Sequence, residues 1–104
     1  MSIARTFSDD IGRLVLDNPP LNILTRAELA TLRHEMAALA ELPDLRVLVL
    51  SARGKHFSAG ADVGEHLPPH HLTLIPDFLE TVARLEAFPL PIIAAVRGKC
   101  LGGG

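Results

Sequence analysis

The chain has 104 residues, of which 48% are hydrophobic and 21% charged, and its formal net charge is −2. This length allows one domain at most, and this composition predicts a globular domain rather than a disordered one. The near balance of charge gives no general electrostatic reason to bind nucleic acid or an anionic membrane. The single cysteine excludes an internal disulfide, and no apolar run reaches the roughly 18 residues of a membrane span. We expect a cytoplasmic protein.

Four short stretches have the composition of strands. The first two are separated by Ser8-Asp9-Asp10, a turn sequence that predicts a hairpin. The last two are continuous apolar runs, which are typical of strands buried on both faces of a sheet, and we place the third at the centre of the sheet. The expected strands are residues 3–6, 12–17, 45–51 and 92–96.

Two stretches carry apolar residues at helical spacing. Thr25, with Glu28 three residues later, has the spacing of a capping box and predicts a helix over 26–42. A second helix is expected within 72–88, beginning close to Pro76. The order strand, strand, helix, strand, helix, strand predicts an α/β layer architecture whose sheet is unfinished where the chain stops.

Two segments that contain glycine each follow a buried strand: 57–62, within a loop expected over 52–64, and 100–104. Ligand sites collect at such strand ends, and two backbone amides converging from separate loops are the parts of an oxyanion hole. A helix starting at Gly103 would add its dipole. The alternative is that these two segments are ordinary tight turns with no ligand site. Because a glycine triplet after a strand usually lets the backbone turn or approach something closely, we expect the polypeptide to continue beyond Gly104.

The two segments together resemble the signatures of the crotonase (enoyl-CoA hydratase/isomerase) family. Residues 56–62 (HFSAGAD) are similar to the first signature, and 91–98 (PIIAAVRG) leading into 101–104 (LGGG) are similar to the second. The resemblance implies an α/β fold built as a spiral of strand-strand-helix units. Residues 1–104 would then be the N-terminal part of one such domain, truncated after the fourth predicted strand, and the full-length protein would be a homotrimer or hexamer.

The resemblance also implies a site. The backbone amides of Ala61 and Gly103 would form the oxyanion hole that stabilises the enolate of an acyl-coenzyme A thioester. Ala59, Asp62 and Val63 would line the path of the substrate and its coenzyme A, the last two through backbone contacts. Helix capping by Asp62 and packing by Val63 are the alternatives for those two residues.

One departure from the family concerns a cation. Many members have a lysine where this chain has Gly64, so one contact to the nucleotide phosphates lacks its usual donor. Arg26, Arg53 and Lys55 are candidates to replace it, although each is more simply explained as a solvated surface charge.

No catalytic acid or base can be assigned, because the hydratases of the family use glutamates beyond the glycine triplet. Glu65, expected in a mobile loop, and Glu80, expected in a helix, are interpreted as solvated residues. Cys100 is expected to be a small packed residue rather than a nucleophile. We expect no metal and no cofactor other than the coenzyme A of the substrate, and the three histidines near the second helix match no zinc spacing. These histidines, His66, His70 and His71, are expected to face solvent. The resemblance implies that their loop, 65–71, lies where members of the family form a wall of the acyl pocket.

Within the family, residues 65–68, 96–101 and 18–22 look most like cyclohexa-1,5-dienecarbonyl-CoA hydratases of anaerobic aromatic degradation. The expected activity is therefore a carbon-oxygen lyase reaction, the hydration of an enoyl or cyclic dienoyl thioester. The alternatives are another crotonase reaction, such as isomerisation or thioester hydrolysis, and a CoA-binding remnant without catalysis. As a free chain, residues 1–104 would leave strand edges unpaired, and we expect them to aggregate and to be inactive.

Overall fold

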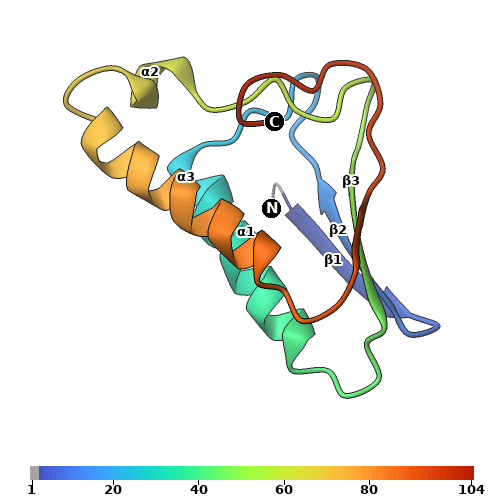
Figure 1. The fold of residues 1–104 in the computed structure, drawn as a ribbon. Coiled ribbons are helices and arrows are strands. Elements are labelled where there is room, and N and C mark those ends of the chain that lie inside the picture. The colour runs from blue at the N-terminus through green and yellow to red at the C-terminus, as the bar shows by residue number, and fades with distance from the viewer. Residues whose placement is uncertain (1–2) are drawn as a thin grey trace.

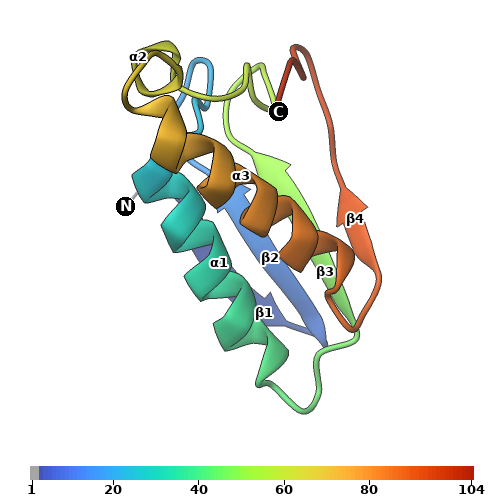
Figure 2. The ribbon, with the colours of Figure 1, turned by 60° about the vertical axis from the view of Figure 1, so that its left-hand side comes forward.

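The computed structural model describes residues 3–104 and contains one four-stranded sheet with its helices on one side (Figure 1). The sheet order is β1-β2-β3-β4, in which β1 and β2 are antiparallel and the other neighbours are parallel. Helices α1 and α3 lie side by side over the same face of the sheet (Figure 2). The strands are β1 (Ile3–Ser8), β2 (Ile11–Leu16), β3 (Val47–Ala52) and β4 (Ile92–Ala94), and the helices are α1 (Arg26–Ala40), α2 (Val63–His66) and α3 (His71–Glu86).

The predicted hairpin is confirmed. Asp9 and Asp10 join β1 to β2 with φ angles of 52° and 65°. Two successive residues with positive φ are the signature of a type I′ turn, whose twist matches the right-handed twist of the two strands. The ladder runs from Ile3 opposite Leu16 to Ser8 opposite Ile11, so β1 is two residues longer than expected.

Helix α1 begins where the capping box predicted. The Thr25 hydroxyl accepts a hydrogen bond from the Glu28 amide at 3.1 Å, and the helix ends at Ala40 rather than at residue 42. One acidic residue of the helix, Glu35, is buried, and it forms an ion pair with Arg5 of β1 at 2.8 Å. The apolar stripe is buried as expected: Leu29, Leu32, Met36 and Leu39.

The strand register places one set of apolar residues under the helices. Leu14 of β2 lies beside Leu50 of β3, Leu48 lies beside Gly12, and Leu14 and Leu48 are fully buried. Residues one position away point to the opposite face, which no helix of the described chain covers. The third predicted strand is an inner strand of the sheet, as expected.

The fourth strand departs from the prediction. β4 covers only Ile92–Ala94, lies at the edge of the sheet and is not buried on both faces, since 56% of Ile93 is exposed. The run of apolar residues was correctly identified as a strand. Its burial was overestimated because the helices of the described chain cover one face of the sheet only.

The second helical region is longer than predicted at its start. Helix α3 begins at His71, and Pro76 lies inside it rather than at its first turn. At this position proline removes the amide that would bond to the Leu72 carbonyl, and its ring crowds that carbonyl. The short helix α2 lies within a region expected to be loop. The buried side of α3 carries Leu74, Phe78, Thr81 and Leu85.

Candidate functional site

Two loops meet at the ends of β3 and β4, at one end of the sheet (Figure 1). The first loop covers residues 53–62 and the second loop covers 95–104. They are joined by three backbone hydrogen bonds that continue the parallel pairing past the strands. The Phe57 amide donates to the Arg97 carbonyl at 2.8 Å, the Ser58 amide to the Lys99 carbonyl at 3.2 Å, and the Leu101 amide to the Ser58 carbonyl at 3.0 Å. The two signature segments are thus brought together.

Ser58 is the centre of this junction. Its side chain is fully buried, and its hydroxyl donates to the Asn22 carbonyl at 2.8 Å while accepting from the Gly60 amide at 3.1 Å. Sequence reasoning did not single out Ser58. A polar residue between Phe57 and the small residues that follow was the available signal, because a hydroxyl in such a segment must find partners when it is buried.

Asn22 fixes the first loop through hydrogen bonds of its side chain. It is 2% exposed, its Nδ2 donates to the carbonyls of Arg53 and His56 at 3.0 and 2.9 Å, and its Oδ1 accepts from the Asn18 amide at 2.8 Å. Its φ of 47° lies in the left-handed region, which asparagine tolerates better than most residues. Asn22 was also missed by the sequence reasoning, although the turn that contains it was noted.

Ala61 follows Gly60, a position where any residue other than glycine would be strained. Gly60 has a φ of 106°, and a Cβ there would lie 2.9 Å from the Leu101 carbonyl oxygen of the second loop. The groups on either side of Ala61 bond to Leu24: the Leu24 amide donates to the Gly60 carbonyl, and the Asp62 amide donates to the Leu24 carbonyl. The Ala61 amide itself has no acceptor among residues 3–104.

Gly103 lies at the centre of a tight turn. The Gly104 amide donates to the Leu101 carbonyl at 2.7 Å, and Gly102 within the turn has a φ of 52°. The structure shows this turn at the position where a helix start was considered. In the described part of the chain, the Gly103 amide, like that of Ala61, donates to no protein acceptor.

Ala61 and Gly103 line the same cavity, which has a volume of about 180 Å³. Its other walls are His66 of α2 and four apolar side chains of α3, namely Leu74, Ile75, Phe78 and Leu79. Two unpaired amides beside an apolar hollow can stabilise negative charge that develops on a carbonyl oxygen while the hydrocarbon part of the same molecule is buried.

The residues after Ala61 begin α2. The Asp62 carboxylate accepts from the Glu65 amide at 3.0 Å, so the capping role that was the alternative for Asp62 is confirmed. The packing alternative for Val63 is wrong, because 75% of this residue is exposed. Ala59 is half-buried, and its amide donates to the Leu21 carbonyl at 2.9 Å.

The two glutamates that were set aside as bases bond elsewhere. Glu65 lies in α2, not in a mobile loop, and its Oε1 accepts from the Arg26 amide at 2.8 Å. Glu80 is on the exposed side of α3 and pairs with Arg84 at 2.9 Å, as a solvated residue should. Of the cations considered as phosphate ligands, Arg53 pairs with Asp17 at 3.5 Å.

Cys100 and the histidines were only partly placed correctly. Cys100 is exposed rather than packed, because it follows the edge strand β4 and nothing in the described chain covers it. His66 and His70 are exposed as expected, whereas His71 is half-buried as the first residue of α3. Among residues 3–104 no cluster of three potential metal ligands exists, and no helix is long and apolar enough to cross a bilayer.

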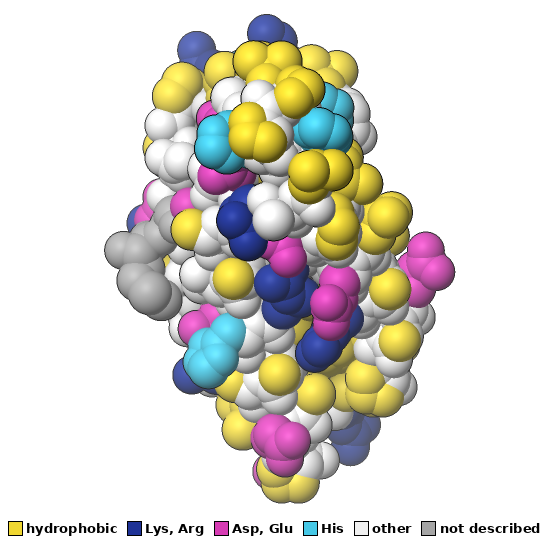
Figure 3. Space-filling model, turned by 90° about the vertical axis from the view of Figure 1, so that its left-hand side faces the viewer, with side chains coloured by type: hydrophobic (Ala, Val, Ile, Leu, Met, Phe, Trp, Pro, Cys, Tyr) yellow, Lys and Arg dark blue, Asp and Glu magenta, His cyan; other side chains and the backbone are white. Residues whose placement is uncertain are grey.

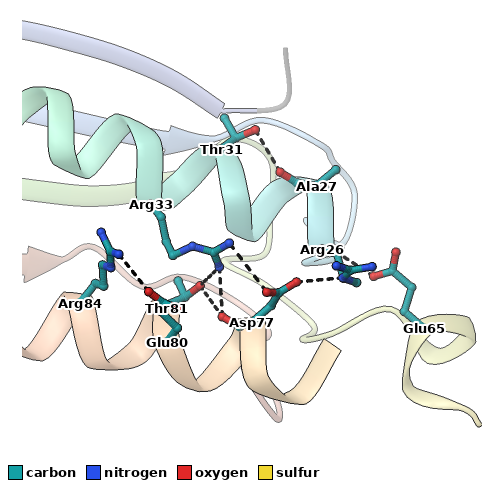
Figure 4. A network of polar contacts seen from close by, with 9 residues as sticks. All are labelled: Arg26, Ala27, Thr31, Arg33, Glu65, Asp77, Glu80, Thr81 and Arg84. Carbon is teal, nitrogen blue, oxygen red and sulfur yellow. Dashed lines mark hydrogen bonds and ion pairs between the residues drawn. The ribbon is translucent and has the colours of Figure 1, made fainter. Parts of the chain in front are cut away.

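A polar network fixes α3 against α1 behind the cavity (Figure 4). Arg33 of α1 donates to the Thr81 hydroxyl at 2.8 Å and to the Asp77 carbonyl at 3.1 Å, and the Asp77 carboxylate pairs with Arg26 at 2.8 Å. Charged side chains of both signs follow one another down the middle of this outer face, beside hydrophobic side chains (Figure 3). The network sets the position of the turn of α3 that carries Phe78.

Comparison with known proteins identifies the family. The model of the enoyl-CoA hydratase/isomerase family matches residues 6–104. Cyclohexa-1,5-dienecarbonyl-CoA hydratase from Thauera aromatica is 39% identical over 92 residues, which are 88% of this chain and 36% of that protein. The predicted resemblance to this group of hydratases is thereby confirmed.

Solved structures agree with this fold. An enoyl-CoA hydratase/isomerase from Xanthobacter autotrophicus superposes with a TM-score of 0.90 at 26% identity, over 99% of this chain and 41% of its own. Human enoyl coenzyme A hydratase domain-containing protein 3 gives a TM-score of 0.87 at 29% identity, over 94% of this chain and 41% of its own. The chain spans less than half the length of these relatives, and within that span it has their fold. The chain therefore belongs to the enoyl-CoA hydratase/isomerase family, the crotonases.

Proposed function

We propose that the polypeptide carrying this chain is an acyl-CoA thioester hydratase whose oxyanion hole is formed by the amides of Ala61 and Gly103. The observation that carries the proposal is the pairing of these two amides: both lack a protein acceptor among residues 3–104, and both residues line one apolar cavity. Backbone donors that are held in place before the substrate arrives need no reorganisation when charge develops on the thioester oxygen.

The substrate follows from the cavity and from the relatives. The hydrocarbon walls favour a hydrocarbon acyl group, and a relative that is 39% identical is named as a hydratase of a cyclic dienoyl thioester. The reaction is water addition to the conjugated double bond of an enoyl or cyclic dienoyl thioester, with no cofactor besides the coenzyme A of the substrate. Backbone atoms at Asp62 and Val63 would contact the coenzyme A, and trimers or hexamers are the proposed assembly.

The first experiment identifies the reaction. The whole polypeptide that the gene encodes is incubated with crotonyl-CoA and with cyclohexa-1,5-dienecarbonyl-CoA, and the products are analysed by mass spectrometry. Hydration adds the mass of one water, isomerisation leaves the mass unchanged, and hydrolysis releases free coenzyme A. Binding of both thioesters without any product would show a binding protein instead of an enzyme.

The second experiment tests the oxyanion hole through a matched pair of variants. Ala61→Pro deletes the amide N–H without breaking any hydrogen bond of the folded chain, since the Ala61 amide has no protein acceptor. Ala61→Ser keeps the amide and changes only the side chain. We expect kcat to fall about 10²- to 10³-fold in Ala61→Pro and only slightly in Ala61→Ser. Equal kcat in the two variants would refute the role of this amide.

A further inference from the structure

A second cavity lies behind the first, toward the core. It has a volume of about 80 Å³ and lies between the sheet and α3. It shares two residues with the outer cavity, Phe78 and Gly103. Its walls are otherwise almost entirely hydrocarbon, including Leu16, Leu24, Leu29, Leu50 and Phe57.

The ring of Phe78 stands at the boundary between the two cavities. Three atoms at the far end of this ring, Cζ and both Cε, face the α-carbon of Gly103 so closely that a Cβ at Gly103 would overlap them. The ring therefore packs directly on a glycine that lines the outer cavity. A side chain in this place both supports the second loop and closes the way from the outer cavity to the inner one.

The ring is held in position by the network between α1 and α3. Asp77, the preceding residue, and Thr81, one turn later, both receive hydrogen bonds from Arg33. Thr81 is 2% exposed, and its hydroxyl donates to the Asp77 carbonyl at 2.8 Å, so its polar atom is satisfied and leaves the inner cavity apolar. These bonds hold the turn of α3 that carries Phe78 against α1.

We propose that Phe78 determines acyl-group specificity by restricting the substrate to the outer cavity. The inference rests on the proposed function and names its substrate class: short or single-ring acyl groups. An apolar cavity of about 150 Å³ accommodates benzene, so the outer cavity of about 180 Å³ matches one six-membered ring or a chain of a few carbons. Removal of the ring would join the inner cavity to the outer one and admit a longer chain.

The test compares acyl-chain selectivity in the whole polypeptide. Wild type, Phe78→Leu and Phe78→Ala are assayed with trans-2-enoyl-CoA thioesters of four and ten carbons, which are probes of chain length. The quantity compared is the ratio of kcat/KM for the long thioester to kcat/KM for the short one. This ratio does not depend on how much of each variant is folded, because both substrates meet the same enzyme sample.

Phe88→Leu is the matched control. Phe88 is also half-buried and undergoes the same chemical change, but it lines a different cavity, between α1 and the end of α3. We expect the ratio to rise about tenfold or more in Phe78→Ala, to rise less in Phe78→Leu, and to stay at the wild-type value in Phe88→Leu. An unchanged ratio in both Phe78 variants, or an equal rise in Phe88→Leu, would overturn the inference.

A binding measurement separates this inference from the proposed function. Hydration fails as the activity if wild type turns over neither of these thioesters nor cyclohexa-1,5-dienecarbonyl-CoA. Whenever the two chain-length probes are not turned over, the dissociation constants of butyryl-CoA and decanoyl-CoA are measured by calorimetry instead. A preference of wild type for the short thioester that reverses in Phe78→Ala supports the role of Phe78 without catalysis. Equal preferences in wild type and variant, or no binding of either thioester, refute it.

Discussion

Replacement of Asn22 by glycine should lower the free energy of unfolding by about 3 kcal/mol. The side chain makes three hydrogen bonds, to the Arg53 and His56 carbonyls and from the Asn18 amide, each worth about 1 kcal/mol. The residue is 2% exposed, so water does not readily replace these partners. Glycine keeps the left-handed backbone conformation of this position without strain, so most of the effect comes from the lost side chain and a smaller part from the greater freedom of glycine in the unfolded chain.

Two further variants separate the causes. Asn22→Ala should be about 1 kcal/mol less stable than Asn22→Gly, because alanine at a φ of 47° pays the left-handed penalty in addition. Asn22→Asp should be at least as destabilising as Asn22→Gly, since a carboxylate would face two carbonyl oxygens that now receive donors.

The assay is urea unfolding of the whole polypeptide at a fixed protein concentration, followed by circular dichroism. If Asn22→Gly unfolded within about 0.5 kcal/mol of wild type, which is the usual range of neutral surface substitutions, the three hydrogen bonds would not be stabilising and the reasoning would be refuted. Loss of stability in Asn22→Ala alone would attribute the whole effect to the backbone.

Three other predictions concern the packing that supports the site. Leu14→Ala, at a fully buried position under the helices, should cost about 3 kcal/mol in the same urea assay, and a cost below about 1 kcal/mol would show that this part of the core is loosely packed. Thr25→Ala removes the bond to the Glu28 amide and should cost about 1 kcal/mol, read as a lower Tm, whereas Thr25→Ser should retain wild-type stability. Arg33→Met and Thr81→Val should be coupled by about 1 kcal/mol in a double-mutant cycle, and additive effects would contradict the hydrogen bond between them.

Local patterns were sufficient for most of the secondary structure. A turn of two aspartates between apolar stretches predicted the first hairpin, and Thr25 with Glu28 predicted the start of α1. These features depend on residues that are neighbours in the sequence, so the chain itself contains all the information. The family was likewise predictable, because two short signatures in the correct order resemble it closely.

Burial was less predictable, since it depends on which elements pack together. The continuous apolar run of residues 92–96 is typical of a strand covered on both faces, but it does not say which elements lie against the strand, so the exposed position of β4 could not be inferred from its composition. Glu35 is a similar case: its burial depends on Arg5, which is 30 positions earlier in the sequence and lies on a different element.

The sequence by itself determined the family of this protein and which two loops carry its signatures. Only the tertiary structure decided how the site is assembled, because Ser58, Asn22 and Phe78 act through partners that are distant in the sequence. Ser58 and Asn22 do so by hydrogen bonds that buried polar groups must form. Phe78 does so by close packing against a glycine that leaves room for its ring, a contact that no periodicity along the chain reveals.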